Sequence, residues 1–330
     1  MLPLDLLCCP VTRTPLRLEG DVLVGEGGQR YGIDPNGVPH FAETMLSPEA
    51  ERQRRHYQKI AKSYVENMQY PHTEEYSAYL DRVFLDAFSG LALATVAEVC
   101  CGQGDVPRLL GQRVGRGVGV DISPDMLAAA VRSNAGSAFS FVQGNATSLP
   151  LRDGVFDCVV MSGGIHHVND RRGLFTEVAR VLRPGGALVW REPVNDFFAW
   201  RWLRAIIYRT APGLDAETES PLTYDGTVPR LTEAGLQLEA WRPCGFLGFC
   251  LLMNSDVLVF NRLLRYWPGI RMLARAAARF DDWVTSQPSL RTVGLQVVGV
   301  ARKTTGKTIG KTIGKTIGKT IGKTIGKTTG

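Results

Sequence analysis

The fold is decided by the stretch AEVCCGQGD, residues 97–105. It joins an apolar segment, ATVAEVC at 94–100, to a segment in which Val106, Leu109 and Leu110 recur at helical spacing. This order predicts a buried strand, a tight turn and a helix. Glycines at 102 and 104 let a backbone approach a ligand closely, at the edge of the sheet where the strand ends.

Further apolar segments follow the same plan. We predict strands at 117–122, 139–145, 156–162, 187–193, 236–241 and 295–301, with helices between them, notably at 124–133 and 172–182. Short buried strands that alternate with helices indicate an α/β protein with a doubly wound, mostly parallel sheet. Ligands of such sheets bind at the carboxyl ends of the strands.

The second predicted strand ends in Asp121, whose carboxylate can accept hydrogen bonds from both hydroxyls of a ribose. Asp121 could instead cap the helix that begins near Ser123-Pro124. The dinucleotide fingerprint requires a third glycine at position 107, which is Pro107 here. A nucleoside cofactor without phosphates, such as S-adenosyl-L-methionine, therefore fits better than NAD.

Five motifs, in order and spacing, resemble class I S-adenosylmethionine-dependent methyltransferases of the type 11 group. They are AEVCCGQGD, GVGVDISPDML, FVQGNATSLPLRDGVFDCVV, GIHHVND and EVARVLRPGGALVWREP. The resemblance implies a Rossmann-like, doubly wound sheet of seven strands and methyl transfer from S-adenosyl-L-methionine. The residues that it implies for cofactor binding are Glu98, Cys101, Gly102, Gly104, Asp121, Ile122, Asn145, Ala146 and Met161.

The resemblance also assigns roles to these positions. It places Glu98 near the amino end of the cofactor, Asp121 on the ribose, Ile122 and Asn145 on the adenine, Ala146 at a backbone contact and Met161 beside the sulfonium. Two positions depart from the pattern: Cys100 replaces the usual first loop glycine, and Asn145 replaces the usual aspartate. An amide oxygen can still accept a hydrogen bond from the adenine amino group.

His166 and His167 follow the predicted strand at 156–162, where the methyl group would lie. A neutral imidazole can remove the proton of a hydroxyl acceptor near pH 7, so either histidine is a candidate catalytic base. Alternatively, both brace the next helix together with Asp170. Adjacent histidines without a nearby carboxylate pair do not indicate a metal site, and we expect no bound metal.

Residues 1–45 are predicted to form a small β-rich module, in which 16–24 read as a hairpin. It resembles the zinc-ribbon-like domain that precedes some bacterial methyltransferases. Thr12 stands where a CPxC pair would place its second cysteine after Cys9, so we expect a degenerate ribbon without zinc. Residues 46–90 are predicted to be helical and to pack on the next domain, with Tyr57 or Tyr64 as candidates to cover a ligand.

The substrate side of the domain at 91–302 contains an aromatic stretch at 197–208 and a helical insertion at about 246–287. Arg271, Arg275 and Arg279 recur every four residues in this insertion. The helix could lie on an anionic membrane, cover the active site as a lid, or pack on the sheet with a solvated arginine face. The aromatic residues predict an apolar or lipid-like acceptor.

Charge and cysteine content narrow the function classes. The formal net charge of the 330 residues is +6, but it falls to −1 without the seven lysines from Lys303 onward. A nearly neutral globular part argues against nucleic acid as partner, although an RNA methyltransferase and a non-catalytic binding protein remain alternatives. The sequence has seven cysteines, an odd number that does not suit a framework of disulfides. It shows no basic leader and no long apolar run, so we expect a cytoplasmic protein. The repeat at 303–330 is expected to be disordered, and the oligomeric state is left open.

Overall fold

The computed structural model describes residues 2–42, 67–202, 220–253 and 259–305. Its centre is a seven-stranded sheet in the order β6-β5-β4-β7-β8-β10-β9, in which β10 alone runs antiparallel to its neighbours. The strands are β4 (Thr95–Val99), β5 (Arg116–Asp121), β6 (Phe139–Gln143), β7 (Phe156–Ser162), β8 (Leu182–Pro193), β9 (Leu236–Cys244) and β10 (Gln296–Lys303). The predicted Rossmann-like, doubly wound sheet is confirmed.

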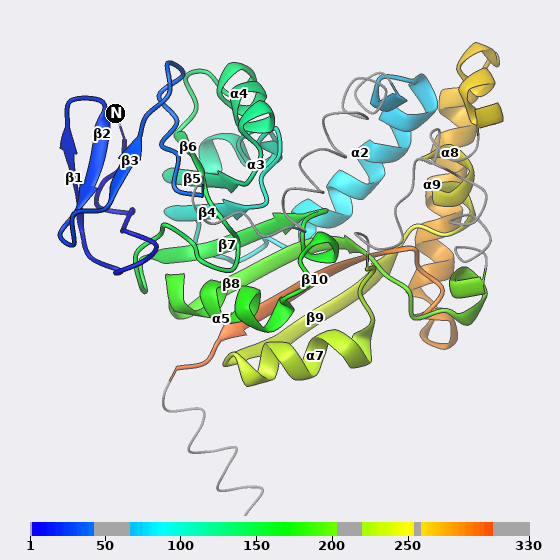
Figure 1. The fold of residues 1–330 in the computed structure, drawn as a ribbon. Coiled ribbons are helices and arrows are strands. Elements are labelled where there is room, and N and C mark those ends of the chain that lie inside the picture. The colour runs from blue at the N-terminus through cyan, green and yellow to red at the C-terminus, as the bar shows by residue number, and fades with distance from the viewer. Residues whose placement is uncertain (1, 43–66, 203–219, 254–258, 306–330) are drawn as a thin grey trace, which may run out of the picture.

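Helices cover both faces of this sheet (Figure 1). They are α2 (Pro71–Asp86), α3 (Asp105–Leu110), α4 (Pro124–Ser133), α5 (Arg171–Val181) and α7 (Tyr224–Glu233), with short 3-10 turns η1 (Gly111–Arg113), η2 (Ile165–His167) and η4 (Pro288–Leu290). Neighbouring strand residues point to opposite faces. Val96 and Val160 pack with α2 and α3, whereas Val99 and Met161 pack with α5 and α7. Both faces are therefore apolar, which explains the nearly continuous hydrophobic strands.

The N-terminal module holds a three-stranded antiparallel sheet of β1 (Leu16–Glu19), β2 (Val22–Gly25) and β3 (Arg30–Gly32). The predicted hairpin is present, with Gly20 at φ +65° in its turn. Leu7, Leu23 and Phe41 belong to the same hydrophobic core as the strands of the large sheet. Phe41 N–H donates to the Gln143 carbonyl at 3.0 Å, so the module also pairs with the exposed edge of β6.

The thiols of this module make hydrogen bonds within the protein. Cys8 Sγ donates to the Leu151 carbonyl at 3.1 Å, and Cys9 Sγ lies 3.1 Å from the Tyr31 hydroxyl. Within the described ranges, no cluster of three or more His, Cys, Asp or Glu side chains is arranged to hold a metal ion. The absence of zinc stays a prediction for metal analysis.

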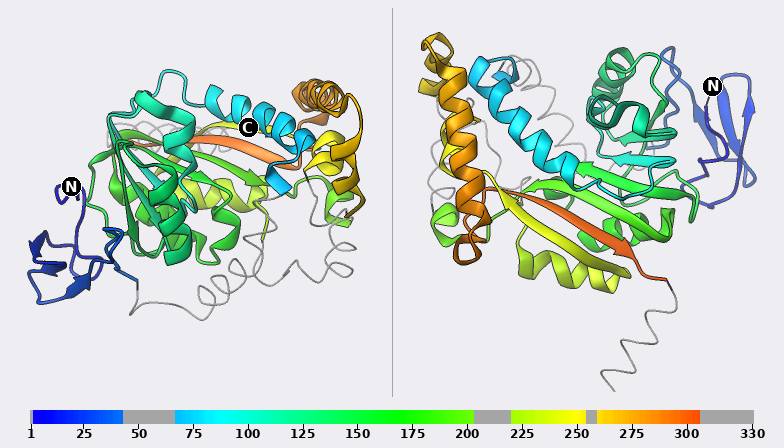
Figure 2. Two further views of the ribbon diagram at one scale, coloured as in Figure 1. Left: turned by 90° about the horizontal axis from the view of Figure 1, so that it is seen from above. Right: turned by 180° about the vertical axis from the view of Figure 1, so that it is seen from behind.

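The insertion between β9 and β10 comprises α8 (Leu247–Leu252), η3 (Val259–Tyr266) and α9 (Ile270–Ser286). It leaves the sheet at the carboxyl edge, because β9 ends there and the antiparallel β10 begins there. Figure 2 shows α9 lying beside α2, beyond that edge. Arg191 joins α2 to the sheet, since its guanidinium contacts Asp81 at 2.8 Å and the Ser162 hydroxyl at 3.3 Å.

Some predictions fall on residues that the structure does not describe. These predictions concern the helix start at Ser47, the side chains of Tyr57, Tyr64 and Tyr208, and the repeat from Gly306. The predicted tail begins at Lys303, whereas β10 includes Lys303 and the next residue, Thr304, donates its N–H to the Gly235 carbonyl at 2.9 Å. In the parts of the chain that are described, no helix is both long and apolar enough to cross a membrane.

Candidate active site

The glycine loop after β4 adopts a left-handed path. Cys100, Gly102 and Gly104 have φ angles of +56°, +50° and +76°. A side chain at Gly104 would place its Cβ 2.9 Å from the Phe141 ring, so both conformation and space require glycine there. Cys100 keeps the loop conformation without being glycine, at a cost of roughly 1–2 kcal/mol for a left-handed residue.

Glu98 organises the helix that follows the loop. One oxygen, Oε1, accepts hydrogen bonds from the backbone N–H groups of Asp105 and Val106 at 3.1 and 3.2 Å, at the start of α3. The other oxygen, Oε2, is buried and has no partner within the described structure. Burial, reinforced by the nearby carboxylate of Asp105, raises the pKa of Glu98 well above its ordinary value.

Asp121 connects the second strand to the loop. Its Oδ2 accepts from the Gly102 N–H at 2.8 Å, and its Oδ1 accepts from the Ser123 N–H at 2.9 Å. Burial raises the pKa of this carboxyl group, and the backbone hydrogen bonds partly oppose that effect. The cap of α4 is Ser123, whose hydroxyl accepts from the Met126 N–H. Asp121 nevertheless keeps some contact with solvent, and each carboxylate oxygen retains acceptor capacity, as ribose recognition requires.

The residues proposed for the adenine lie at the ends of β5 and β6. Ile122 accepts a hydrogen bond from the Gln143 side chain through its carbonyl at 3.2 Å. Asn145 Oδ1 already accepts from both the N–H and the hydroxyl of Thr147, each at 2.9 Å. What Asn145 offers a ligand is therefore mainly its NH₂ donor, whereas the sequence suggested its oxygen. Ala146 is half-buried beside it.

Cys101 and Met161 are more enclosed than the sequence suggested. Cys101 is buried against α4, in a cluster with Leu127 and Phe141. Met161 is fully buried in the core that faces α5, so its side chain does not reach the open edge of the sheet. A ligand at this edge would meet the backbone near these residues and not their sulfur atoms.

His166 forms a hydrogen-bonded pair with Glu192. Its Nδ1 lies 2.7 Å from Glu192 Oε2, and the fully buried carboxylate also accepts from the Gly164 and Ile165 N–H groups at 2.7 Å each. A carboxylate acceptor selects the tautomer with the proton on Nδ1. The Nε2 atom makes no hydrogen bond to any described residue and carries the lone pair of a base.

His167 has a different position. Its ring stacks on that of His166, with centroids 3.7 Å apart. The backbone N–H of His167 donates to the Gly164 carbonyl at 3.2 Å. Asp170 caps α5, because its side chain accepts from the Gly173 N–H at 2.8 Å. The geometry of a base oriented by a carboxylate is therefore seen at His166.

Glu192 is the functional candidate that sequence reasoning missed. It stands at the end of ALVWREP, and β8 is the direct neighbour of β7 in a parallel sheet. The sequence did contain a signal for this residue. Glu192 is an acid at the carboxyl end of a buried strand, and the two histidines follow the adjacent strand. The order of β7 and β8 in the sheet had to be known before the two could be joined.

The arrangement fits a nucleoside cofactor with a positively charged sulfur centre. The left-handed loop leaves open space beside Gly102, where a backbone can approach a ligand, and Asp121 can hold a ribose. Glu98, Asp121 and Glu192 place three carboxyl groups around this edge of the sheet, and no Arg or Lys side chain of the described residues hydrogen-bonds to any of them. These residues provide no cationic cradle for a pyrophosphate, which agrees with Pro107 in the third glycine position.

Comparisons with known proteins find methyltransferases similar to the central part of the chain. A family model described as a methyltransferase domain matches residues 97–190. Demethylmenaquinone methyltransferase of Bacillus licheniformis is 34% identical over 121 residues, which are 35% of this chain and 52% of that protein. The chloroplastic 2-phytyl-1,4-beta-naphthoquinone methyltransferase of Arabidopsis thaliana is 37% identical over 111 residues, 31% of this chain and 41% of that protein. The chain thus spans about half the length of the relatives it matches.

A solved structure extends the likeness of fold. A SAM-dependent methyltransferase from Thermotoga maritima aligns with 76% of this chain and 99% of its own, at a TM-score of 0.50 and 17% identity. Residues 97–190 are therefore similar to methyltransferase domains, and the fold around them is that of a solved SAM-dependent methyltransferase.

Proposed function

We propose that the protein transfers a methyl group from S-adenosyl-L-methionine to an apolar, quinone-like acceptor that carries a hydroxyl group. The observation that carries this proposal is the His166–Glu192 pair, because it places an oriented base at the carboxyl edge beside the glycine loop. Glu98, Gly102, Gly104 and Asp121 would hold the cofactor there. When bound, the cofactor supplies an electrophilic methyl group on a sulfonium.

The residues of the chain account for the remaining chemistry. His166 Nε2 takes the proton of the acceptor hydroxyl, while Glu192 holds the imidazolium that forms. The freed electron pair, on the oxygen or conjugated onto the adjacent ring carbon, forms the bond to the methyl carbon. The bound cofactor would supply the methyl carbon and would keep the electrons of the broken carbon–sulfur bond on its sulfur. Alignment of donor and acceptor supplies much of the acceleration in such a displacement.

Two observations support an apolar acceptor. The named relatives act on demethylmenaquinone and on a phytyl naphthoquinone, by their descriptions. In this chain, Trp200 packs edge-on against Phe246 with centroids 5.7 Å apart, and its indole N–H donates to the Val293 carbonyl at 2.6 Å. Trp200, in the described part of the aromatic stretch after β8, therefore meets Phe246 at the base of the insertion.

The test compares methyl transfer to a naphthohydroquinone with a long alkyl chain and to a polar phenol. We expect the full chain to prefer the apolar hydroquinone. His166→Ala should lower kcat about 10²–10⁴-fold, the range of general-base catalysis, and leave the affinity for the cofactor nearly unchanged. His167→Ala is the comparison variant, because it removes the stacked neighbouring ring and keeps the His166–Glu192 bond.

Three results would count against the proposal. Transfer to RNA but not to the hydroquinone would favour an RNA methyltransferase. Cofactor binding without transfer to any acceptor would favour a non-catalytic binding protein. A larger loss in His167→Ala than in His166→Ala would leave methyl transfer intact but assign the base to the wrong histidine.

A further inference from the structure

Helix α9 has an apolar stripe on its outer side. Its inner side, which includes Ala274, Ala278 and Asp281, is buried against α2 and α8. At 100° per residue, the exposed residues Met272, Leu273, Ala276, Phe280 and Trp283 fall within an arc of about 100°. Met272 is 73% exposed and Trp283 60%. A soluble helix normally turns such a stripe toward a core.

Further apolar side chains are exposed on the segments of the insertion next to α9. Tyr266 and Trp267, at the end of η3 and just after it, are 70% and 62% exposed, and Leu263 and Leu251 are exposed as well. Helices α8 and α9 are packed together, and η3 contacts α9. We call this set of exposed side chains on α8, η3 and α9 the insertion face.

A row of arginines lies beside the apolar stripe. Arg271, Arg275 and Arg279 occupy the neighbouring arc of α9, between the stripe and α2. Arg271 and Arg275 pair with Glu74 and Glu75 of α2 at 2.7 and 3.0 Å. Arg279 has no carboxylate partner in the described part of the chain.

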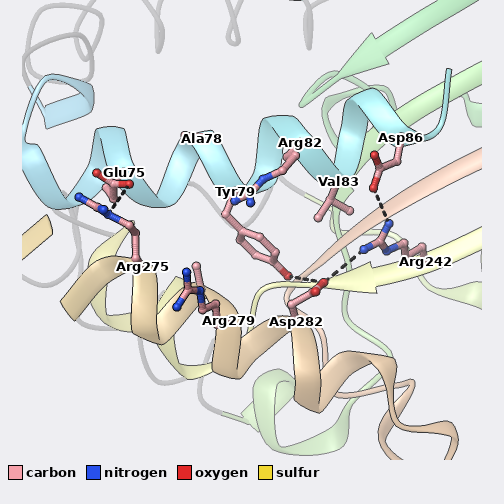
Figure 3. Close-up of a pocket in the computed structure, with 11 residues that line it drawn as sticks. Glu75, Ala78, Tyr79, Arg82, Val83, Asp86, Arg242, Arg275, Arg279 and Asp282 are labelled. Carbon is pink, nitrogen blue, oxygen red and sulfur yellow. Dashed lines mark hydrogen bonds and ion pairs between the residues drawn. The ribbon is translucent and has the colours of Figure 1, made fainter. Parts of the chain in front are cut away.

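Arg279 faces a cavity of about 280 Å³ between α2 and α9 (Figure 3). The charged residues that line it are Glu75, Arg82, Asp86, Arg242, Arg275, Arg279 and Asp282. Arg242 bridges Asp86 and Asp282 at 3.2 Å each, whereas Arg82, like Arg279, is without an ion pair among the described residues. The lining thus carries one excess positive charge and two guanidinium groups that are available to an anion.

We propose that the insertion face docks the protein on an anionic lipid bilayer, with Arg82 and Arg279 receiving lipid phosphates. Tryptophan, tyrosine and methionine side chains beside unpaired arginines suit the boundary between headgroups and acyl chains. Guanidinium groups bind phosphate oxygens in a fork geometry, which gives the charge complementarity. A second copy of this face would bring the same excess of positive charge together, which disfavours a symmetric dimer.

The site of docking relates to the proposed chemistry. The insertion leaves the carboxyl edge of the sheet, where the base and the glycine loop lie. A bilayer on the insertion face would therefore contact the segment that leaves the same edge of the sheet as the proposed base. Docking itself does not depend on methyl transfer, so the two proposals can fail separately.

The experiment measures co-sedimentation of the full chain with phosphatidylcholine vesicles, with and without phosphatidylglycerol. We expect binding mainly to the anionic vesicles, weakened by salt. The double variant Phe280→Ser with Trp283→Ser should bind at least tenfold more weakly, because burial of one large apolar side chain contributes about 1.5–3 kcal/mol. Arg279→Glu should lose about tenfold on anionic vesicles only, since each basic residue near such a surface contributes about 1 kcal/mol.

Matched controls lie elsewhere on the surface. Leu18→Ser changes an exposed leucine of β1, and Arg132→Glu reverses an exposed, unpaired charge of α4 in the described structure; both should bind like the wild type. All variants keep the lysine-rich tail, so equal binding by all of them would overturn the proposal. Absence of vesicle binding by the wild type would overturn it too. Sedimentation velocity that shows a wild-type dimer dissociated by the double variant would assign the face to self-association.

Discussion

Glu192 and Glu98 are both buried acids beside the glycine loop, but their surroundings differ. Both oxygens of Glu192 accept hydrogen bonds, from three backbone N–H groups and the His166 ring. Glu98 uses a single oxygen for two N–H groups and leaves the other buried without a partner in the described structure. Glu98 is therefore suited to a ligand that completes its hydrogen bonding, whereas Glu192 is already committed to the histidine.

The pKa of Glu98 predicts how stability depends on pH. A carboxyl group whose pKa is raised on folding binds more protons in the folded state, so folding stability falls as pH rises from the ordinary carboxyl pKa toward the raised value. Glu98→Gln keeps an oxygen for the Asp105 and Val106 N–H groups but cannot ionise. We expect this variant to lose less Tm than the wild type between pH 5 and pH 8, measured by circular dichroism without cofactor.

The same substitution should weaken cofactor binding, because a neutral amide attracts the amino end of the cofactor less than a carboxylate does. Calorimetric titration with the demethylated product measures this. The control is Glu26→Gln, which makes the same change on the exposed surface of the N-terminal module. An identical pH dependence of Tm in Glu98→Gln and wild type would contradict the assigned ionisation.

At the scale of elements, the insertion is assembled around one buried carboxylate. Asp281 of α9 accepts from the Tyr76 hydroxyl of α2 at 2.5 Å. It also accepts from three backbone N–H groups at the start of α8, those of Phe246, Gly248 and Phe249, at 2.7–3.1 Å. Burial and the adjacent Asp281 charge raise the pKa of Tyr76, which keeps its hydroxyl protonated as a donor. Asp281 thus joins three helices.

We predict that Asp281→Ala lowers the free energy of unfolding by about 3–5 kcal/mol, because it leaves several buried donors unsatisfied. The neighbouring residue gives a matched control. Asp282 is half-exposed and pairs with Arg242 at the surface, so Asp282→Ala should cost at most about 1 kcal/mol. Urea unfolding of both variants measures the difference. Equal losses would show that the helices are held by their apolar contacts and not by Asp281.

At the scale of the whole molecule, the N-terminal module and the large sheet share a core. Phe41 is buried, its ring lies 4.7 Å from that of Tyr31, and its backbone pairs with β6. Arg13 reaches the Leu149 carbonyl at 2.8 Å and Glu177 at 3.0 Å. The module therefore covers the edge of the sheet, which would otherwise present unpaired backbone groups.

We predict that Phe41→Ala destabilises the module and the sheet in a single transition. Removal of a buried phenylalanine ring costs about 3–5 kcal/mol. Scanning calorimetry should show one shifted transition, and Val11→Ala, which changes an exposed side chain of the same module, should leave the transition in place. A separate early transition with an unchanged main peak would show that the module unfolds independently.

Much of the fold is local in origin and was predictable from the sequence. Glycines with positive φ, the proline and serine at the start of α4, and the two-residue alternation of the strands each act over a few residues. These signals placed seven strands and located Glu98, Gly102, Gly104 and Asp121 around one loop. The domain boundaries and the roles of these residues stay predictions.

The tertiary structure decided what depends on distant partners. His166 and His167 are equivalent in the sequence, but only the order of β7 and β8 in the sheet brings Glu192, 26 residues later, to His166. The sequence likewise left three readings of the arginine helix open, because its spacing gives the faces of α9 but not their neighbours. Packing against α2 buries one of those faces and leaves the apolar stripe outside. Periodicity determines which residues share a face, whereas long-range contacts determine what that face meets.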